Sequence, residues 1–114
     1  MRVIIAGSRE LTPNIDLIVK KSTFKITQLI CGMARGVDIA GYNWAKQHNI
    51  PILEFPADWT TYGKRAGYLR NKVMAQNADA LIAIWDGYSK GTQHMINLAK
   101  QYDLKIYVYL ANEV

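Results

Sequence analysis

The chain has 114 residues, which suits one domain with one hydrophobic core. Half of its residues are hydrophobic and 20% are charged, a balance that excludes disorder. The longest apolar runs, about five or six residues, exclude a membrane span. The net charge of +5 is compatible with anionic partners, but the basic residues are spread evenly over both halves, so charge alone does not indicate a nucleic-acid surface.

Cysteine usage and the N-terminus point to the cytoplasm. Cys31 is the single cysteine, which excludes an internal disulfide. The opening stretch MRVIIAGSRE becomes polar too early for a secretory signal. His48 and His94 are far apart and no Cys/His spacing fits a metal site, so we expect no metal.

The first half of the chain alternates strand and helix. Residues 2–7 form a short apolar run that predicts a buried strand. Thr12 is a candidate N-cap, with Pro13 at the first position of a helix that ends near Thr23. A second strand is predicted over residues 26–32 and a second helix over 37–48.

The second half repeats the pattern around a long loop. A third strand is expected over 51–55, followed by an aromatic and charged loop over 56–67 that has the composition of a functional loop. A helix over 66–76 leads to the most apolar strand, 78–85, and then to a loop over 86–91.

The last helix is predicted over residues 92–102 and the last strand over 105–110. Short apolar strands separated by helices are typical of a parallel sheet with helices on both faces. We therefore predict, for residues 1–114, one α/β domain: a Rossmann-like doubly wound sheet of about five mainly parallel strands flanked by helices. Ligands of such sheets bind beyond the carboxyl ends of the strands, where the strand order reverses.

Gly7, Ser8 and Arg9 directly follow the first strand. Glycine permits close backbone approach, Ser8 offers a hydroxyl, and Arg9 can form forked hydrogen bonds to a phosphate or carboxylate. A simple turn with a solvated arginine explains the triplet equally well.

The turn after the second strand reads Gly32-Met-Ala-Arg-Gly36-Val-Asp38. Amides at the helix start can face an anion, and Asp38 can accept hydrogen bonds from a ribose or from loop amides. The glycine spacing matches neither the dinucleotide fingerprint nor a Walker A loop. Asp38 could instead be an ordinary first-turn acid that complements the helix dipole.

Ser89, Gly91 and Thr92 open the last helix together with Lys90, a combination that suits a phosphate. The alternative is an ordinary Ser/Thr N-cap. His94, two residues later, is interpreted as a helix-surface histidine rather than a general base.

Trp59 lies in the long loop, where it either stacks on a base or packs in the core. Arg70 and Asn71 are neighbours on the following helix, so they point about 100° apart. We expect one of them to face the site and the other to brace a loop.

The segments GSR, CGMARGVDIAGYNWA, FPADW, GKRAGYLRNKVM and AIWDGYSKGTQHMINLA together resemble the YspA-like branch of the SLOG superfamily. That superfamily includes the LOG phosphoribohydrolases and the DNA-processing protein DprA. The resemblance covers nearly the whole chain in one order. It implies a Rossmann-like fold that binds a nucleotide or nucleotide-derived ligand. The site residues that it implies are Gly7, Ser8, Arg9, Gly32, Ala34, Gly36, Asp38, Asp58, Trp59, Arg70, Asn71, Ser89, Gly91 and Thr92.

These residues predict a binding protein, a sensor, carrier or sequestering protein, with a nucleotide-like small molecule as partner. Phosphate would lie on the amides of Gly91 and Thr92 and on the turn 32–36, with Arg9 beside it. Asp38 or Asp58 would contact sugar hydroxyls. We expect no cofactor, and a homodimer is expected because relatives of this fold often dimerise.

Three alternative hypotheses for the function stay open. The first is hydrolysis of a nucleotide N-glycosidic bond, but Met95 stands where the LOG enzymes carry their catalytic glutamate, so we predict no catalytic residue. The second is a DprA-like binder of single-stranded DNA, which would use Lys64, Arg65, Arg70 and Lys72. The third is an oligomerising scaffold with a vestigial pocket.

Overall fold

The computed structural model of the chain describes residues 1–111. Five strands form one sheet in the order β3-β2-β1-β4-β5, and every pairing is parallel. The strands are β1 (Arg2–Gly7), β2 (Gln28–Cys31), β3 (Ile52–Glu54), β4 (Ala80–Trp85) and β5 (Lys105–Leu110). The predicted Rossmann-like α/β sheet is therefore confirmed.

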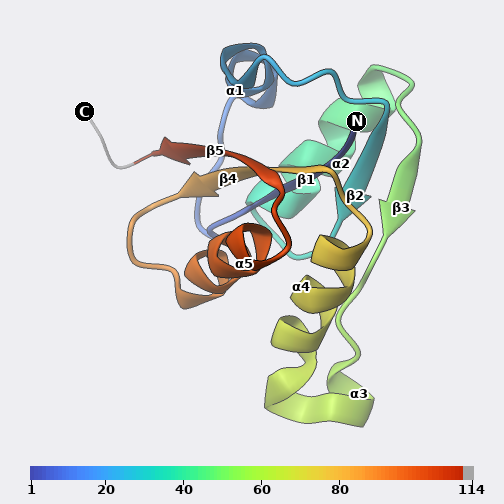
Figure 1. The fold of residues 1–114 in the computed structure, drawn as a ribbon, viewed down its shortest axis with the longest axis vertical. Coiled ribbons are helices and arrows are strands. Elements are labelled where there is room, and N and C mark those ends of the chain that lie inside the picture. Colours follow the sequence, from blue (N-terminus) through green and yellow to red (C-terminus); the bar gives the residue numbers. More distant parts are fainter. Residues whose placement is uncertain (112–114) are drawn as a thin grey trace.

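Helices connect the strands and cover both faces of the sheet. The helices are α1 (Ile15–Ser22), α2 (Val37–Gln47), α3 (Trp59–Tyr62), α4 (Ala66–Gln76) and α5 (Lys90–Gln101), with a 3₁₀ turn at Gly63–Arg65. Figure 1 shows α1 above the strands and α4 and α5 below them, with α3 at the foot of the molecule.

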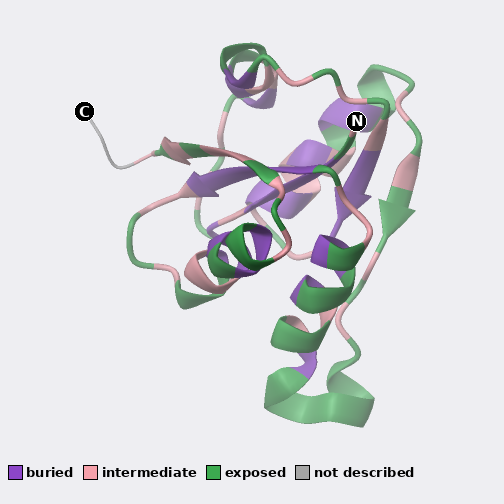
Figure 2. Cartoon of the chain, viewed as in Figure 1, coloured by how far each residue is buried: buried purple, intermediate pink, exposed green. Residues whose placement is uncertain are grey.

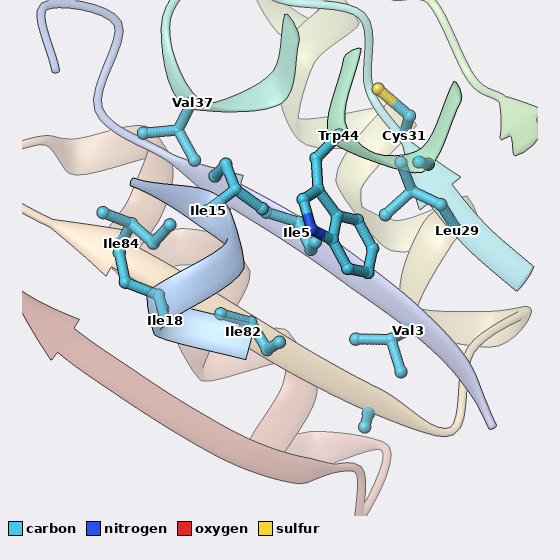
Figure 3. Packing of buried hydrophobic residues seen from close by; sticks show 12 residues of the cluster. Val3, Ile5, Ile15, Ile18, Leu29, Cys31, Val37, Trp44, Ile82 and Ile84 are labelled. Atoms are coloured by element: carbon cyan, nitrogen blue, oxygen red, sulfur yellow. The ribbon is translucent and has the colours of Figure 1, made fainter. Parts of the chain in front are cut away.

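Alternate residues of the central strands enter two separate cores, because successive side chains of a strand point to opposite faces. Val3 and Ile5 of β1 pack with α1 and α2, whereas Ile4 packs with α4 and α5. Figure 3 shows the first core, where Trp44 lies beside Leu29 and Cys31. Burial of each such aliphatic side chain contributes about 1.5–3 kcal/mol to folding.

Solvent exposure differs between the central strands and α3. β1, β2 and β4 are buried along most of their length, whereas α3 is exposed throughout, as Figure 2 shows. The three central strands are therefore held by the core. The exposed helix α3 lies in the connection between β3 and α4.

The start of α1 differs from the prediction. The helix begins at Ile15 and not at Pro13, because Asn14 caps it: its Oδ1 accepts a hydrogen bond from the Leu17 amide at 3.2 Å. Asparagine is a stronger cap than threonine, which explains the choice of residue 14 over residue 12. Thr23, predicted as the helix end, is instead its left-handed C-cap, with φ of 62°.

The predicted loop 56–67 is also partly wrong, since it contains α3 and the 3₁₀ turn. Asp58 caps α3 by accepting a hydrogen bond from the Thr61 amide at 3.0 Å. The segment lacks the apolar periodicity from which a helix is predicted, because none of its four residues is buried.

Candidate functional site

The strand order reverses between β1 and β4, because the chain runs outward to β3 and then returns to the other side of β1. Beyond the carboxyl ends of these strands lies a cleft of about 450 Å³. A parallel sheet places its ligand sites at this position. The cleft lies between the loops that follow β1, β2 and β4 and the segment 59–74 of α3 and α4.

Most of the predicted site residues line this cleft. They are Gly7, Ser8, Arg9, Ala34, Asp38, Trp59, Arg70, Asn71, Ser89, Gly91 and Thr92. Gly32 lines an adjoining hollow, and Gly36 and Asp58 line neither space.

Ser8 joins the two central strands to α2. Its amide donates to the Ile84 carbonyl at 3.1 Å, and its Oγ accepts from the Asp86 amide at 3.2 Å. Its own carbonyl oxygen accepts from the Val37 amide at 3.5 Å. Ser8 thus holds the ends of β1 and β4 and the start of α2 together on one wall of the cleft.

Asp38 is a carboxyl group at the floor of the cleft, and its residue is only 5% exposed. Oδ2 accepts a hydrogen bond from the Ala34 amide at 3.3 Å. Burial raises the pKa of Asp38 to about 6, against the opposing effect of the Arg70 charge. A buried carboxyl that titrates near neutral pH inside a cleft is a typical mark of a functional site.

Two glycines of the turn after β2 allow the close approach of loops. A Cβ on Gly32 would lie 2.7 Å from Asp38 Oδ2 and 2.8 Å from Arg70 Nη1, so a side chain there would separate the two charged groups. Gly36 has φ of 78°, and a Cβ on it would overlap the Arg9 carbonyl. These glycines therefore position Asp38 and Arg9 and offer no surface of their own to a ligand in the cleft.

Arg70 and Asn71 of α4 both line the cleft and both brace a loop, so the expected division of roles between them is wrong. The Arg70 guanidinium donates to the Gly32 carbonyl through Nη1 and to Asn71 Oδ1 through Nε, the latter at 3.0 Å. Asn71 Nδ2 donates to the Gly91 carbonyl at 3.5 Å. Arg70 therefore ties α4 to the turn after β2, and Asn71 ties it to the start of α5.

The start of α5 is a fixed polar rim of the cleft. Ser89 is the N-cap, and its Oγ accepts from the Thr92 amide at 3.4 Å. Asp86 Oδ1 accepts from the amides of Tyr88 and Ser89, both at 2.8 Å, which lowers the pKa of Asp86. The Thr92 amide, one of the two predicted to bind a phosphate, is thus occupied by Ser89, whereas helix geometry leaves the Gly91 amide without an intrahelical acceptor and able to bind an anion.

The aromatic wall of the cleft comes from α3 and α4. Trp59 is 51% exposed, and its Cη2 would lie 3.5 Å from a Cβ placed on Gly67. Tyr68, the residue after Gly67 on α4, packs edge-on against His94, with ring centroids 4.5 Å apart. Trp59 is therefore not a core residue, and its ring is open to the cleft.

Asp58 serves the backbone instead of the cleft. Its hydrogen bonds with Thr61 lower the pKa of the carboxyl, which caps the start of α3. Its position shows that a residue adjacent in sequence to Trp59 need not share its surroundings.

Four polar lining residues were absent from the predicted nucleotide site: Glu10, Lys64, Tyr68 and Asp86. Asp86 directly follows β4, so its position at a strand end could have identified it. Glu10 and Tyr68 carry no such signal, because their places depend on how the β1 loop and α4 pack.

No three or more His, Cys, Asp or Glu residues among the described residues form a group that could hold a metal ion. Within residues 1–111, no helix is long and apolar enough to cross a membrane.

The sheet order and the cleft at its reversal define a Rossmann-like α/β protein. The model of the family described as YspA, cpYpsA-related SLOG matches residues 1–62. The Gene 61 protein of Mycobacterium phage D29 is 33% identical in an alignment 112 residues long, and the match covers 88% of this chain and 89% of that protein. The chain therefore belongs to the YspA, cpYpsA-related SLOG family, as its motifs predict. No solved structure matches it.

Proposed function

We propose that the cleft binds a nucleotide or nucleotide-derived ligand and that the protein acts as a sensor, carrier or sequestering protein. Membership of the SLOG family supports a nucleotide ligand. The observation that carries the proposal is the composition of one cleft, which is lined by the exposed ring of Trp59, by Arg9 and by Gly91 in the first turn of α5. Aromatic rings stack on bases, while arginine and helix N-termini bind phosphate.

We assign the parts of the ligand to the groups that line the cleft. Trp59 covers the base, and the Gly91 amide binds a phosphate together with Arg9. The Asp38 carboxylate lies near the start of α2 and accepts from Ala34, so it disfavours a phosphate on the turn 32–36. A sugar hydroxyl, which donates a hydrogen bond, is the group that Asp38 favours.

Thermal shift with a panel of ligands tests the proposal. The panel holds mono- and dinucleotides, cyclic nucleotides, ADP-ribose, nicotinamide cofactors and a short single-stranded DNA. A ligand at about 100 times its Kd adds roughly 2.7 kcal/mol, which corresponds to a rise of more than about 10 °C for a domain near this size. No shift with any nucleotide would contradict the proposal, and a shift with DNA alone would favour the DprA-like alternative.

Arg9→Ala and Trp59→Leu should both weaken binding without loss of fold. Arg2→Ala is the matched control, since Arg2 lies at the opposite end of β1 with its side chain half exposed. Equal affinities in wild type, Arg9→Ala and Trp59→Leu would exclude this cleft as the binding site.

One observation favours a second function, hydrolysis of an N-glycosidic bond. The buried Asp38, with its pKa raised to about 6, has the protonation behaviour of a general acid or base. Met95, which stands at the position of the LOG glutamate, lines the cleft but cannot transfer a proton. Release of free base from nucleoside monophosphates, abolished in Asp38→Asn, would establish this activity, and intact nucleotides after long incubation would exclude it.

A further inference from the structure

A second hollow of about 360 Å³ adjoins the cleft. The two spaces share four lining residues: Arg9, Ala34, Trp59 and Arg70. The second hollow is otherwise bounded by residues of the turn after β2 and of the segment that leads to α3, namely Gly32, Met33, Arg35, Pro56 and Ala57. A ligand that passes between Arg9 and Arg70 can therefore occupy both spaces.

The charges of the two spaces differ. Three basic residues of the cleft, Arg9, Lys64 and Arg70, are matched by three acids in the same lining, Glu10, Asp38 and Asp86. The second hollow, by contrast, has three arginines and no acid among its nine lining residues. We call it the arginine hollow. Its lining favours an anion more strongly than that of the cleft, because the two carboxylates that lie near its arginines, Glu10 beside Arg35 and Asp38 near Arg70, are both outside that lining.

The guanidinium groups of this hollow have donors available. Arg70 uses Nη1 and Nε for Gly32 and Asn71, which leaves the rest of its five donors for a ligand. Arg35 pairs with Glu10 at 2.6 Å, but both side chains are more than 70% exposed. Such a solvated pair contributes at most about 1 kcal/mol, so an anion of higher charge can replace Glu10 as the partner of Arg35.

We propose that the arginine hollow binds the distal phosphate of a nucleotide that carries two or more phosphates in a chain. This inference rests on the proposed function, since the nucleoside and its first phosphate occupy the cleft. The phosphate chain crosses the boundary between Arg9 and Arg70, and its end reaches Arg35. The site then selects nucleoside diphosphates and triphosphates over monophosphates, and Glu10 lowers that selectivity because it competes for Arg35.

Titration calorimetry with the mono-, di- and triphosphates of the four common ribonucleosides tests the inference. For the base that binds, the diphosphate should bind about tenfold more tightly than the monophosphate, the effect expected from one or two partly solvated charge-assisted hydrogen bonds. Arg35→Ala should remove most of that ratio and leave monophosphate affinity unchanged. Glu10→Gln should increase the ratio, because it frees Arg35.

Arg65→Ala is the matched control, an exposed arginine at the start of α4 that lines neither space. Equal affinity for mono- and diphosphate, or a ratio that Arg35→Ala leaves intact, would overturn the inference and leave the proposed function standing. Absence of binding by every nucleotide would overturn the proposed function and this inference with it.

Discussion

The side-chain amide of Asn71, which lines the cleft, lies 3.3 Å from Nδ1 of His94 and so joins α4 to α5. An amide N–H can donate only to an unprotonated Nδ1, which favours the neutral His94 with its proton on Nε2. Partial burial lowers the pKa of His94 below its ordinary value of 6.5. The pair is thus intact when His94 is neutral and is broken when it is charged.

We therefore expect His94 to make stability depend on pH. The lowered pKa means that the unfolded chain binds the proton more readily, so the contribution of His94 is present above pH 6.5 and is lost as the pH falls through its folded pKa. The difference in unfolding free energy between wild type and His94→Gln, measured in urea from pH 4.5 to 8, should be larger at neutral pH. A difference that is constant across this range would contradict the prediction.

Asp38 should act in the opposite sense. Its pKa rises from 3.8 to about 6 on folding, so its neutral form stabilises the fold below about pH 4, and about 3 kcal/mol is lost as the pH rises to 6. Asp38→Asn should therefore be more stable than wild type at pH 7.5, by about 1–3 kcal/mol, and should lose this part of the pH dependence. Urea unfolding at several pH values measures both effects.

The same variant should bind the ligand of the cleft more weakly, because an uncharged amide is a poorer acceptor for sugar hydroxyls than a carboxylate. Greater stability with weaker binding is the expected combination for a buried group kept for function. A destabilised Asp38→Asn at pH 7.5 would show that Asp38 contributes to the fold and not only to the site.

Substitution of Gly36, in the turn beside the cleft, can be compared with substitution of Gly63, in the 3₁₀ turn. Both have positive φ, 78° and 56°, but a Cβ on Gly36 meets the Arg9 carbonyl whereas a Cβ on Gly63 has open space. Gly63→Ala should cost about 1–3 kcal/mol, the strain of the backbone alone. Gly36→Ala should cost more, because the loops after β1 and β2 must also separate. Equal losses in thermal unfolding would contradict the close approach of these loops.

A comparison of Ser8→Ala with Ser22→Ala distinguishes an effect on stability from an effect on ligand binding. Ser8 Oγ accepts from the Asp86 amide at 3.2 Å beside the cleft, and Ser22 Oγ accepts from the Phe24 amide at 3.1 Å after α1. Either serine replaced by alanine leaves an amide unpaired, so both variants should lose about 1–3 kcal/mol. Only Ser8→Ala should also weaken ligand binding, as calorimetry on the folded proteins would show. Equal effects on binding would place Ser8 outside the site.

Local patterns in the sequence predicted the parts of the fold that local rules control. The continuous apolar runs of β1 and β4 indicated buried parallel strands because both of their faces are covered by helices. Capping was less predictable: Thr12-Pro13 and Asn14 both fit a helix start, and only the hydrogen bond to Leu17 distinguishes them. α3 had no apolar period to reveal it, since it is exposed throughout.

Local sequence patterns were enough to identify the residues at the carboxyl ends of the strands, because short apolar runs that alternate with helices already indicate a parallel sheet. Which of these residues line the cleft depends on three-dimensional packing. Asp38 and Asp58 are both acids near a helix start, yet one is buried beside Arg70 and the other caps an exposed turn. The arginine hollow likewise depends on three segments brought together by packing, since residues 9, 35 and 70 carry no shared local signal. Long-range packing determines burial and electric potential, so no local pattern could have specified them.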